Sequence, residues 1–172
     1  MRLSWLALLP CLLALLPTAS ADVYQTPEDF LREEQANPAS AESLWLNGEI
    51  KKPVEQILGH PYNALRVKYW RSQGKTLWIL EDIGKDEYIT FGFVIANQSI
   101  ELARVLEFRE SRGWEIKFPS FTRQFTGAKL DPGLGLDREV DGITGATLSV
   151  NAFDRMARLA LLLDKNVEKN AP

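Results

Sequence analysis

The sequence of 172 residues has almost no cysteine and almost no histidine. Cys11 is its only cysteine, so the chain forms no internal disulfide and offers no thiolate metal site. The place of Cys11 close to the N-terminus also disfavours a lipoprotein site, because too short an apolar run precedes it. His60 is the only histidine, in a Gly-His-Pro loop, and a single histidine makes neither a triad nor a histidine metal cluster. The core must therefore be held by packing alone.

An excess of positive charge is also lacking. Twenty Lys and Arg residues against 23 Asp and Glu residues give a formal net charge of −3 at pH 7. No basic stripe is present, which argues against nucleic acid as a partner. The sequence also contains no Gly-rich Rossmann fingerprint and no P-loop, so a dinucleotide-binding fold of that kind is not expected.

One apolar run stands out, and it lies at the N-terminus. Residues 3–16 follow a positively charged start, and Pro10 and Pro17 interrupt or end the run. The run is shorter than the roughly 20 residues of a membrane-spanning helix. It is followed by small residues that end at Ala21, as in a secretory signal peptide cleaved after that residue. We therefore predict that residues 1–21 are a signal peptide and that the mature chain is periplasmic and soluble.

The mature chain is predicted to contain an N-terminal helical and extended segment, 22–63, and one domain, 64–172. Residues 26–29, Thr-Pro-Glu-Asp, predict a short helix because a hydroxyl cap, a proline and two acids follow one another. Residues 43–46 favour a strand, and the apolar spacing within 54–58 favours a helical turn that closes at Gly59.

Four strand-like segments follow, with turn residues between them: 65–70, 76–81, 87–96 and 100–109. Their connections are short, which predicts antiparallel neighbours and not βαβ units. The predicted fold class is α+β, an antiparallel meander of about four strands packed by a C-terminal helix and short N-terminal helices.

The nonapeptide 141–149 reads Asp-Gly-Ile-Thr-Gly-Ala-Thr-Leu-Ser and leads directly into a helical apolar pattern. Thr144 or Thr147 is expected to cap that helix, and the glycines permit a tight turn before it. A helix N-terminus attracts anions, so a hydroxyl there is placed to meet a phosphate. On the residues alone, a simple small-residue cap explains the stretch equally well.

The nonapeptide resembles the D-G-x-[ST]-G-A-T-x-[ST] signature of FMN-binding domains that are flavinylated on threonine. Such domains occur in the flavin-carrying subunits of the Rnf and sodium-pumping NADH:quinone oxidoreductase complexes. The resemblance implies that a flavin transferase, which uses FAD and a divalent metal, joins FMN to Thr147 through a phosphoester. The matching positions are Asp141, Gly142, Thr144, Gly145, Ala146, Thr147 and Ser149.

Two further segments resemble the family at similar spacing, an E-[ST]-x-G turn and a Q-F-x-G segment. The resemblance places them near the flavin, whereas packing alone explains most of them as a surface connection with aromatic core residues. Together the segments extend the resemblance over roughly residues 77–163. The matching positions are Glu110, Ser111, Gly113, Gln124, Phe125 and Gly127.

The acids Asp137, Glu139 and Asp141 alternate, but Arg138 lies among them and no histidine is near, so we predict no metal site. The predicted function is that of a periplasmic electron carrier between a membrane-bound reductase and another acceptor. A sensing, regulatory or scaffold module that binds FMN is the alternative. A flavin reductase, or a hydrolase with Thr147 as nucleophile, is a further one, although the hydrolase lacks a nearby base.

Overall fold

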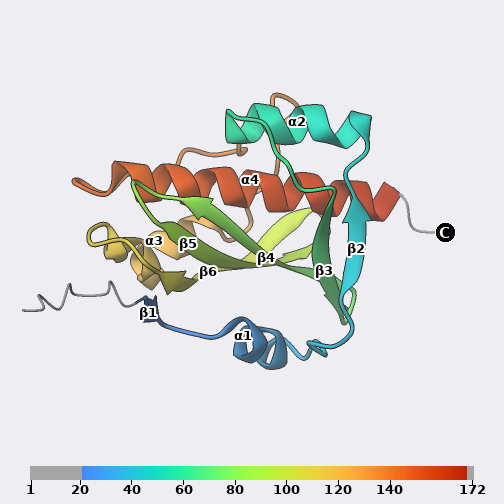
Figure 1. Cartoon of the computed structure of the whole chain (residues 1–172), viewed down its shortest axis with the longest axis horizontal. Helices are drawn as coiled ribbons and strands as arrows, with labels where there is room; N and C mark the ends of the chain where they lie inside the picture. The colour runs from blue at the N-terminus through green and yellow to red at the C-terminus, as the bar shows by residue number, and fades with distance from the viewer. Residues whose placement is uncertain (1–20, 170–172) are drawn as a thin grey trace, which may run out of the picture.

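The computed structural model describes residues 21–169 (Figure 1). The predicted signal peptide, apart from Ala21, lies outside the described residues. Within residues 21–169, no helix is both long enough and apolar enough to cross a membrane.

The described residues form one six-stranded antiparallel sheet with the strand order β1-β6-β5-β4-β3-β2. The predicted α+β class is confirmed, but the sheet has two edge strands beyond the four of the meander. In chain order the elements are β1 (Asp22–Val23), α1 (Pro27–Glu33), β2 (Glu42–Trp45), α2 (Gly48–Leu58), β3 (Arg66–Ser72), β4 (Lys75–Ile83), β5 (Tyr88–Ala96), β6 (Ser99–Phe108), the 3-10 turn η1 (Trp114–Lys117), α3 (Pro119–Thr122), the 3-10 turn η2 (Arg123–Phe125) and α4 (Thr147–Lys169).

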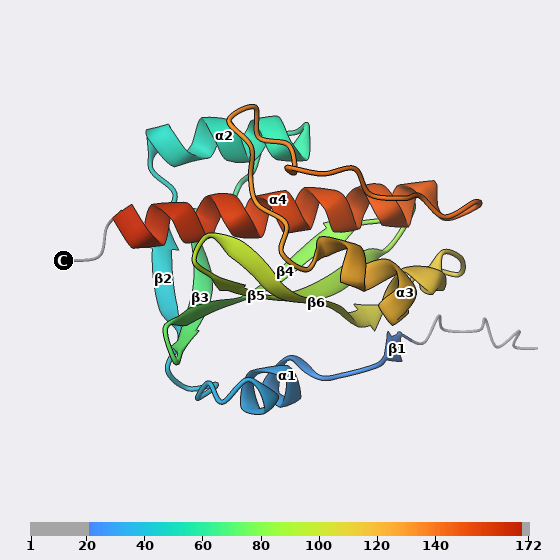
Figure 2. The same cartoon turned by 180° about the vertical axis from the view of Figure 1, so that it is seen from behind.

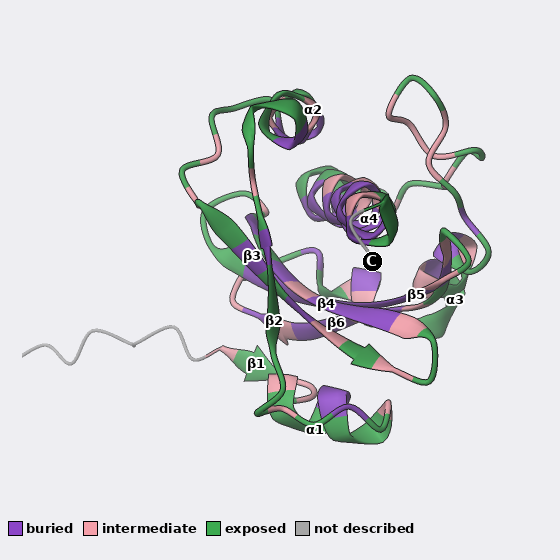
Figure 3. Ribbon diagram, turned by 90° about the vertical axis from the view of Figure 1, so that its right-hand side faces the viewer, coloured by how far each residue is buried: buried purple, intermediate pink, exposed green. Residues whose placement is uncertain are grey.

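Helix α4 crosses one face of the sheet and is itself partly covered by α2 (Figures 1 and 3). Because it has the sheet on one side and α2 on the other, apolar residues occupy more of its surface than one narrow stripe. In its N-terminal half, Phe153 is fully buried and its ring contacts four others, those of Phe91, Phe93, Phe121 and Phe125. This aromatic cluster fixes α4 on the sheet.

Helix α1 covers the opposite face of the sheet (Figure 2). Its Phe30 ring lies directly over Gly92 in the middle of β5, where a Cβ would stand 2.9 Å from the ring. Only a residue without a side chain permits that approach. The face also buries Leu77, Val94 and Leu106. The N-terminal segment is therefore packed on the sheet as its second layer.

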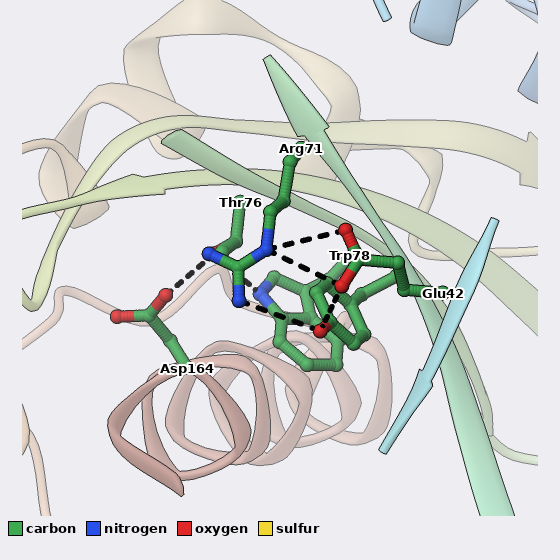
Figure 4. Close-up of polar contacts among 6 residues, drawn as sticks. Glu42, Arg71, Thr76, Trp78 and Asp164 are labelled. Atoms are coloured by element: carbon green, nitrogen blue, oxygen red, sulfur yellow. Dashed lines mark hydrogen bonds and ion pairs between the residues drawn. The ribbon is translucent and has the colours of Figure 1, made fainter. Parts of the chain in front are cut away.

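A buried polar network lies near the C-terminal end of α4 (Figure 4). The Thr76 hydroxyl donates to Asp164 Oδ1 at 2.5 Å and accepts from Trp78 Nε1 at 2.9 Å. Asp164 is 2% exposed, and its Oδ2 has no hydrogen-bond partner among the described residues. Burial raises the pKa of Asp164; the Thr76 hydrogen bond opposes this, nearby Glu168 adds to it and Arg71 reduces it.

Asp164→Asn is expected to stabilise the protein at pH 7 and to leave it nearly unchanged at pH 3. A raised folded-state pKa means that Asp164 favours folding while it is protonated, below its unfolded pKa, and that this contribution disappears as the pH rises through the folded pKa. The neutral amide does not titrate, so the free energy of unfolding at pH 7 should rise by an amount on the order of 1 kcal/mol.

Urea unfolding at both pH values measures this gain, with the exposed Asp86→Asn as the control. Asp86→Asn should change the free energy of unfolding little at either pH. If Asp164→Asn changed the free energy of unfolding equally at pH 3 and pH 7, the ionisation of Asp164 would not be the cause of the change.

Candidate flavin-binding site

Thr147 is the first residue of α4, and its side chain is exposed. The motif turns tightly before it, with Gly145 at φ 85° and the Ala146 N–H donating to Ile143 O at 3.0 Å. The Val150 N–H then donates to Ala146 O at 2.9 Å. Within residues 21–169 neither the Thr144 nor the Thr147 hydroxyl makes a hydrogen bond, so the predicted hydroxyl cap is not formed. The Thr147 hydroxyl remains available at the helix N-terminus.

A cavity of about 540 Å³ opens beside this helix start. Three segments that are distant in the sequence form its walls: the β4–β5 turn, the turn after β6 and the start of α4. Unpaired N–H groups at the start of α4 give this region a partial positive charge. The lining residues are Lys85, Glu110, Ser111, Arg112, Gly145, Ala146, Thr147, Leu148 and Ser149.

Glu110 builds one wall of the cavity by holding the β4–β5 turn. Its Oε1 accepts the backbone N–H groups of Lys85, Asp86 at 2.7 Å and Glu87 at 3.0 Å. Gly84 is part of this arrangement, because a Cβ there would stand 2.8 Å from Glu110 Oε1. The carboxylate thus acts as an anion bound in a nest of N–H groups, and it positions Lys85 at the cavity.

An ion pair braces the same turn against α4. Arg155 Nε lies 2.7 Å from Asp82 Oδ2, and Arg155 Nη2 donates to Ile83 O at 3.3 Å. The Asp82 side chain is only 9% exposed, so water screens this pair less than a surface pair. The end of β4 and the helix that begins with Thr147 are therefore held at a fixed spacing.

Gly113 allows the turn after β6 to approach the helix start. It is buried with φ 88°, and a Cβ there would overlap with Ser149 Oγ and lie 3.1 Å from Ser149 Cβ. Ser149 is itself only 4% exposed, so it has little room to move away. Gly113 does not line the cavity; it brings Ser111 and Arg112 to it.

Gly113→Ala is therefore expected to lower the free energy of unfolding by roughly 2–4 kcal/mol, the sum of left-handed backbone strain and overpacking. Gly145→Ala is the matched control, because Gly145 has φ 85° but nothing within 4 Å of a Cβ. It should cost only the backbone strain, about 1–2 kcal/mol. A urea-denaturation cycle with Ser149→Ala should recover part of the Gly113→Ala loss, and equal losses in the two glycine variants would contradict the close-contact argument.

The Q-F-x-G segment holds the motif loop and does not line the cavity. Gln124 Oε1 accepts the Asp141 N–H at 2.7 Å, and Gln124 Nε2 donates to Asp141 O at 3.4 Å. Phe125 is fully buried, with its ring centroid 4.4 Å from that of Phe153. Gly127 has φ 80° and donates its N–H to Ile100 O at 2.7 Å. These residues fix the direction in which the loop leaves the core.

The structure brings six of the predicted site residues to the cavity: Glu110, Ser111, Gly145, Ala146, Thr147 and Ser149. Asp141, Gly142 and Thr144 lie exposed on the loop that leads to it. The Asp141 side chain makes no hydrogen bond to another residue of the described range; its backbone is held by Gln124 instead. Gln124, which lies outside the nonapeptide, thus holds the loop in place.

Two cavity residues, Lys85 and Arg112, were not among the predicted site residues. Lys85 Nζ lies 2.9 Å from Asp86 Oδ2, whereas Arg112 has no ion pair within residues 21–169. The sequence could have identified Arg112, because it lies inside the E-S-R-G turn. The sequence could not have identified Lys85, because it reaches the site only through the hydrogen bond from its N–H to Glu110.

The alternating acids form no metal site in the described part of the chain. Asp137 Oδ1 accepts the Lys129 N–H at 3.0 Å and lies 3.1 Å from Arg138 Nε. The hydrogen bond from the Lys129 N–H lowers the pKa of Asp137, burial opposes it, and Arg138 adds a further lowering. Asp137 is therefore engaged in holding the loop.

The cavity offers what a phosphate-bearing group requires: a helix N-terminus, hydroxyl groups on Ser111 and Thr147, and the cation of Arg112, which has no acidic partner among the described residues. Residues 84–162 match the family model of the FMN-binding domain. The chain contains an FMN-binding domain. A comparison with curated proteins gave no match.

The FMN-binding domain, as matched, begins at the turn that Glu110 holds and ends within α4. Every residue that lines the cavity falls inside this range. The protein is thus an FMN-binding flavoprotein, and the cavity at the start of α4 is the candidate site for the cofactor. Strands β3 and β4 belong to the same sheet but lie entirely outside the matched range.

Proposed function

We propose that the FMN-binding domain carries FMN covalently, through a phosphoester to Thr147, and acts as a periplasmic electron carrier. Its electrons would come from a membrane-bound reductase and pass to a second acceptor. The observation that carries the proposal is the exposed Thr147 hydroxyl, which has no hydrogen-bond partner in the described chain and stands at a helix N-terminus on the cavity wall. A phosphoester at this point keeps one negative charge, which the helix end favours by about 0.3–1 kcal/mol.

Attachment by a flavin transferase with FAD and a divalent metal accounts for all atoms. The Thr147 oxygen attacks the FMN-side phosphorus of FAD, the pyrophosphate P–O bond breaks, AMP leaves and the hydroxyl proton is released. Arg112 and Ser111 line the cavity next to Thr147 and are placed to bind the phosphate oxygens. FMN, once bound, supplies the redox chemistry, and the chain supplies attachment, orientation and charge.

The cavity supports an electron carrier better than a hydrolase that uses Thr147. A threonine nucleophile needs a nearby general base. Glu110 is the one carboxylate among the residues that line the cavity, and its Oε1 already accepts three backbone N–H groups. His60 lies exposed in the loop after α2, where its Nδ1 is 3.0 Å from Pro61 O.

The test is to produce the chain with and without a flavin transferase and to measure intact mass and visible absorbance after denaturation. The expected result is one added FMN and a flavin spectrum that survives denaturation, only when the transferase is present. The carrier role is then tested by adding a membrane fraction and an electron donor and following bleaching of the flavin. A flavin that stays oxidised while the protein forms a stable complex would favour the regulatory or scaffold module. An unmodified mass in both preparations would refute covalent attachment.

A further inference from the structure

A second groove, of about 560 Å³, lies at the edge of the sheet between β6 and the segment 117–123. It shares no lining residue with the flavin cavity. Its floor is β6, and its walls are the stretch after β1 and the start of α3. The lining residues are Tyr24, Gln25, Leu102, Ala103, Arg104, Val105, Lys117, Phe118, Pro119, Thr122 and Arg123.

The edge of β6 is unpaired where it forms the floor of this groove. Strand β1 pairs only with residues 107–108, and the Tyr24 and Gln25 N–H groups both donate to Leu106 O. At the other end, Ile100 exchanges backbone hydrogen bonds with Gly127 and Ala128. Between these ends, no backbone group of residues 102–105 bonds to another described segment on this edge. An open stretch of strand edge is a template for a further strand.

The groove is positively charged, although the chain as a whole has a net charge of −3. Arg104, Lys117 and Arg123 line it, and no acidic residue does. Arg104 is paired with Glu33 at 2.8 Å. Lys117 and Arg123 have no ion pair in the described chain, and the Lys117 ammonium lies 4.0 Å from the centroid of the Tyr24 ring.

We propose that this groove binds an extended, acidic segment of a partner protein, which adds a short strand to the open edge of β6. Main-chain hydrogen bonds to residues 102–105 would supply register, and acidic side chains would pair with Lys117 and Arg123. The half-exposed Phe118 ring, 42% exposed, offers an apolar contact for alternate side chains of the segment. The combination of an open strand edge and unpaired cations distinguishes a peptide from a small anion, which needs no strand edge.

The proposal goes beyond the proposed function and does not depend on the attachment of FMN. The groove and the flavin cavity are connected, however, because residues of the segment 110–123 line both of them. In the sequence, the exposed Trp114 lies between the lining residues of the two cavities, and its ring centroid is 5.4 Å from that of Phe118. A partner bound in the groove would therefore contact the same segment that lines the FMN site.

The test uses the unmodified chain and a fluorescein-labelled nine-residue peptide in which valine alternates with aspartate or glutamate. Fluorescence polarisation measures affinity, and amide NMR shifts locate the site. We expect binding that weakens with added salt, with the largest shifts at the amides of residues 102–105. Lys117→Glu combined with Arg123→Glu should weaken binding by about tenfold or more, since two attractive charges become repulsive.

The matched control reverses two exposed lysines elsewhere, Lys52→Glu and Lys165→Glu, which make the same change in net charge. It should alter affinity by less than about twofold, since these charges lie away from the groove. A peptide methylated on alternate backbone nitrogens should lose binding if strand addition is correct. Retained binding by that peptide, or equal weakening in both double variants, would overturn the proposal. So would the absence of peptide binding combined with Lys117-dependent binding to vesicles of anionic lipid, which would assign the surface to a membrane.

Discussion

Thr147→Ala is expected to abolish covalent incorporation of FMN completely when the chain is produced together with a flavin transferase. The side chain is exposed at the first position of α4 and makes no hydrogen bond within the described residues. Alanine is the best helix former, so the fold should be unaffected and the free energy of unfolding should change by less than about 0.5 kcal/mol. The loss would then be a loss of the attacking oxygen and of nothing else. Intact mass and the absorbance of the denatured protein measure the result.

The control for this experiment is Thr144→Ala, three residues earlier in the same motif. Thr144 is also exposed and without a hydrogen bond in the described chain, but it does not line the cavity. It should keep the added mass of FMN. If Thr144→Ala lost the flavin and Thr147→Ala kept it, the attachment site would be misassigned. If both variants kept it, the flavin would be attached elsewhere on the chain.

Phe153→Ala is expected to lower the free energy of unfolding by about 3–5 kcal/mol, the typical cost of removing a fully buried phenylalanine ring. Phe153 is 0% exposed and its ring lies 4.4 Å from that of Phe125 and 5.1 Å from that of Phe91, centroid to centroid. The change removes the contact between α4, the sheet and the Q-F-x-G segment together. Urea unfolding followed by circular dichroism is the measurement.

Phe118→Ala provides the comparison, because it removes the same ring from a position that is 42% exposed. It should cost about 1 kcal/mol or less. Phe153→Leu should recover part of the loss, since it leaves a smaller cavity than alanine. Similar losses for Phe153→Ala and Phe118→Ala would show that the aromatic cluster does not fix α4 on the sheet.

The regular elements of this fold were predictable because local rules determine them. Alternation and short turns predict β3, β4, β5 and β6, and the apolar repeat after Thr147 predicts α4. The edge strand β2 matches the strand favoured at 43–46. The edge strand β1 was missed because two residues are too few to show a periodicity. Its partner residues in β6, 107–108, also lie far from it in the sequence.

The candidate site was predictable only in part, because it depends on contacts between distant segments. The threonine motif identifies the start of α4, but it does not reveal that Glu110 binds the β4–β5 turn. Nor does it reveal that Gln124 holds Asp141 by its backbone. The predicted hydroxyl cap failed for a related reason: Ala146 accepts the first helical N–H, and Thr147 begins the helix instead of capping it.

The approach of Phe30 to Gly92 lets helix α1 lie close against the sheet. Helix α1 shields the side chains of Leu77, Val94 and Leu106 from water. A chain that began at residue 64 would lack α1 and would expose these three side chains to water as an apolar patch, which favours aggregation. The N-terminal segment 22–63 thus keeps an apolar face of the sheet out of contact with water.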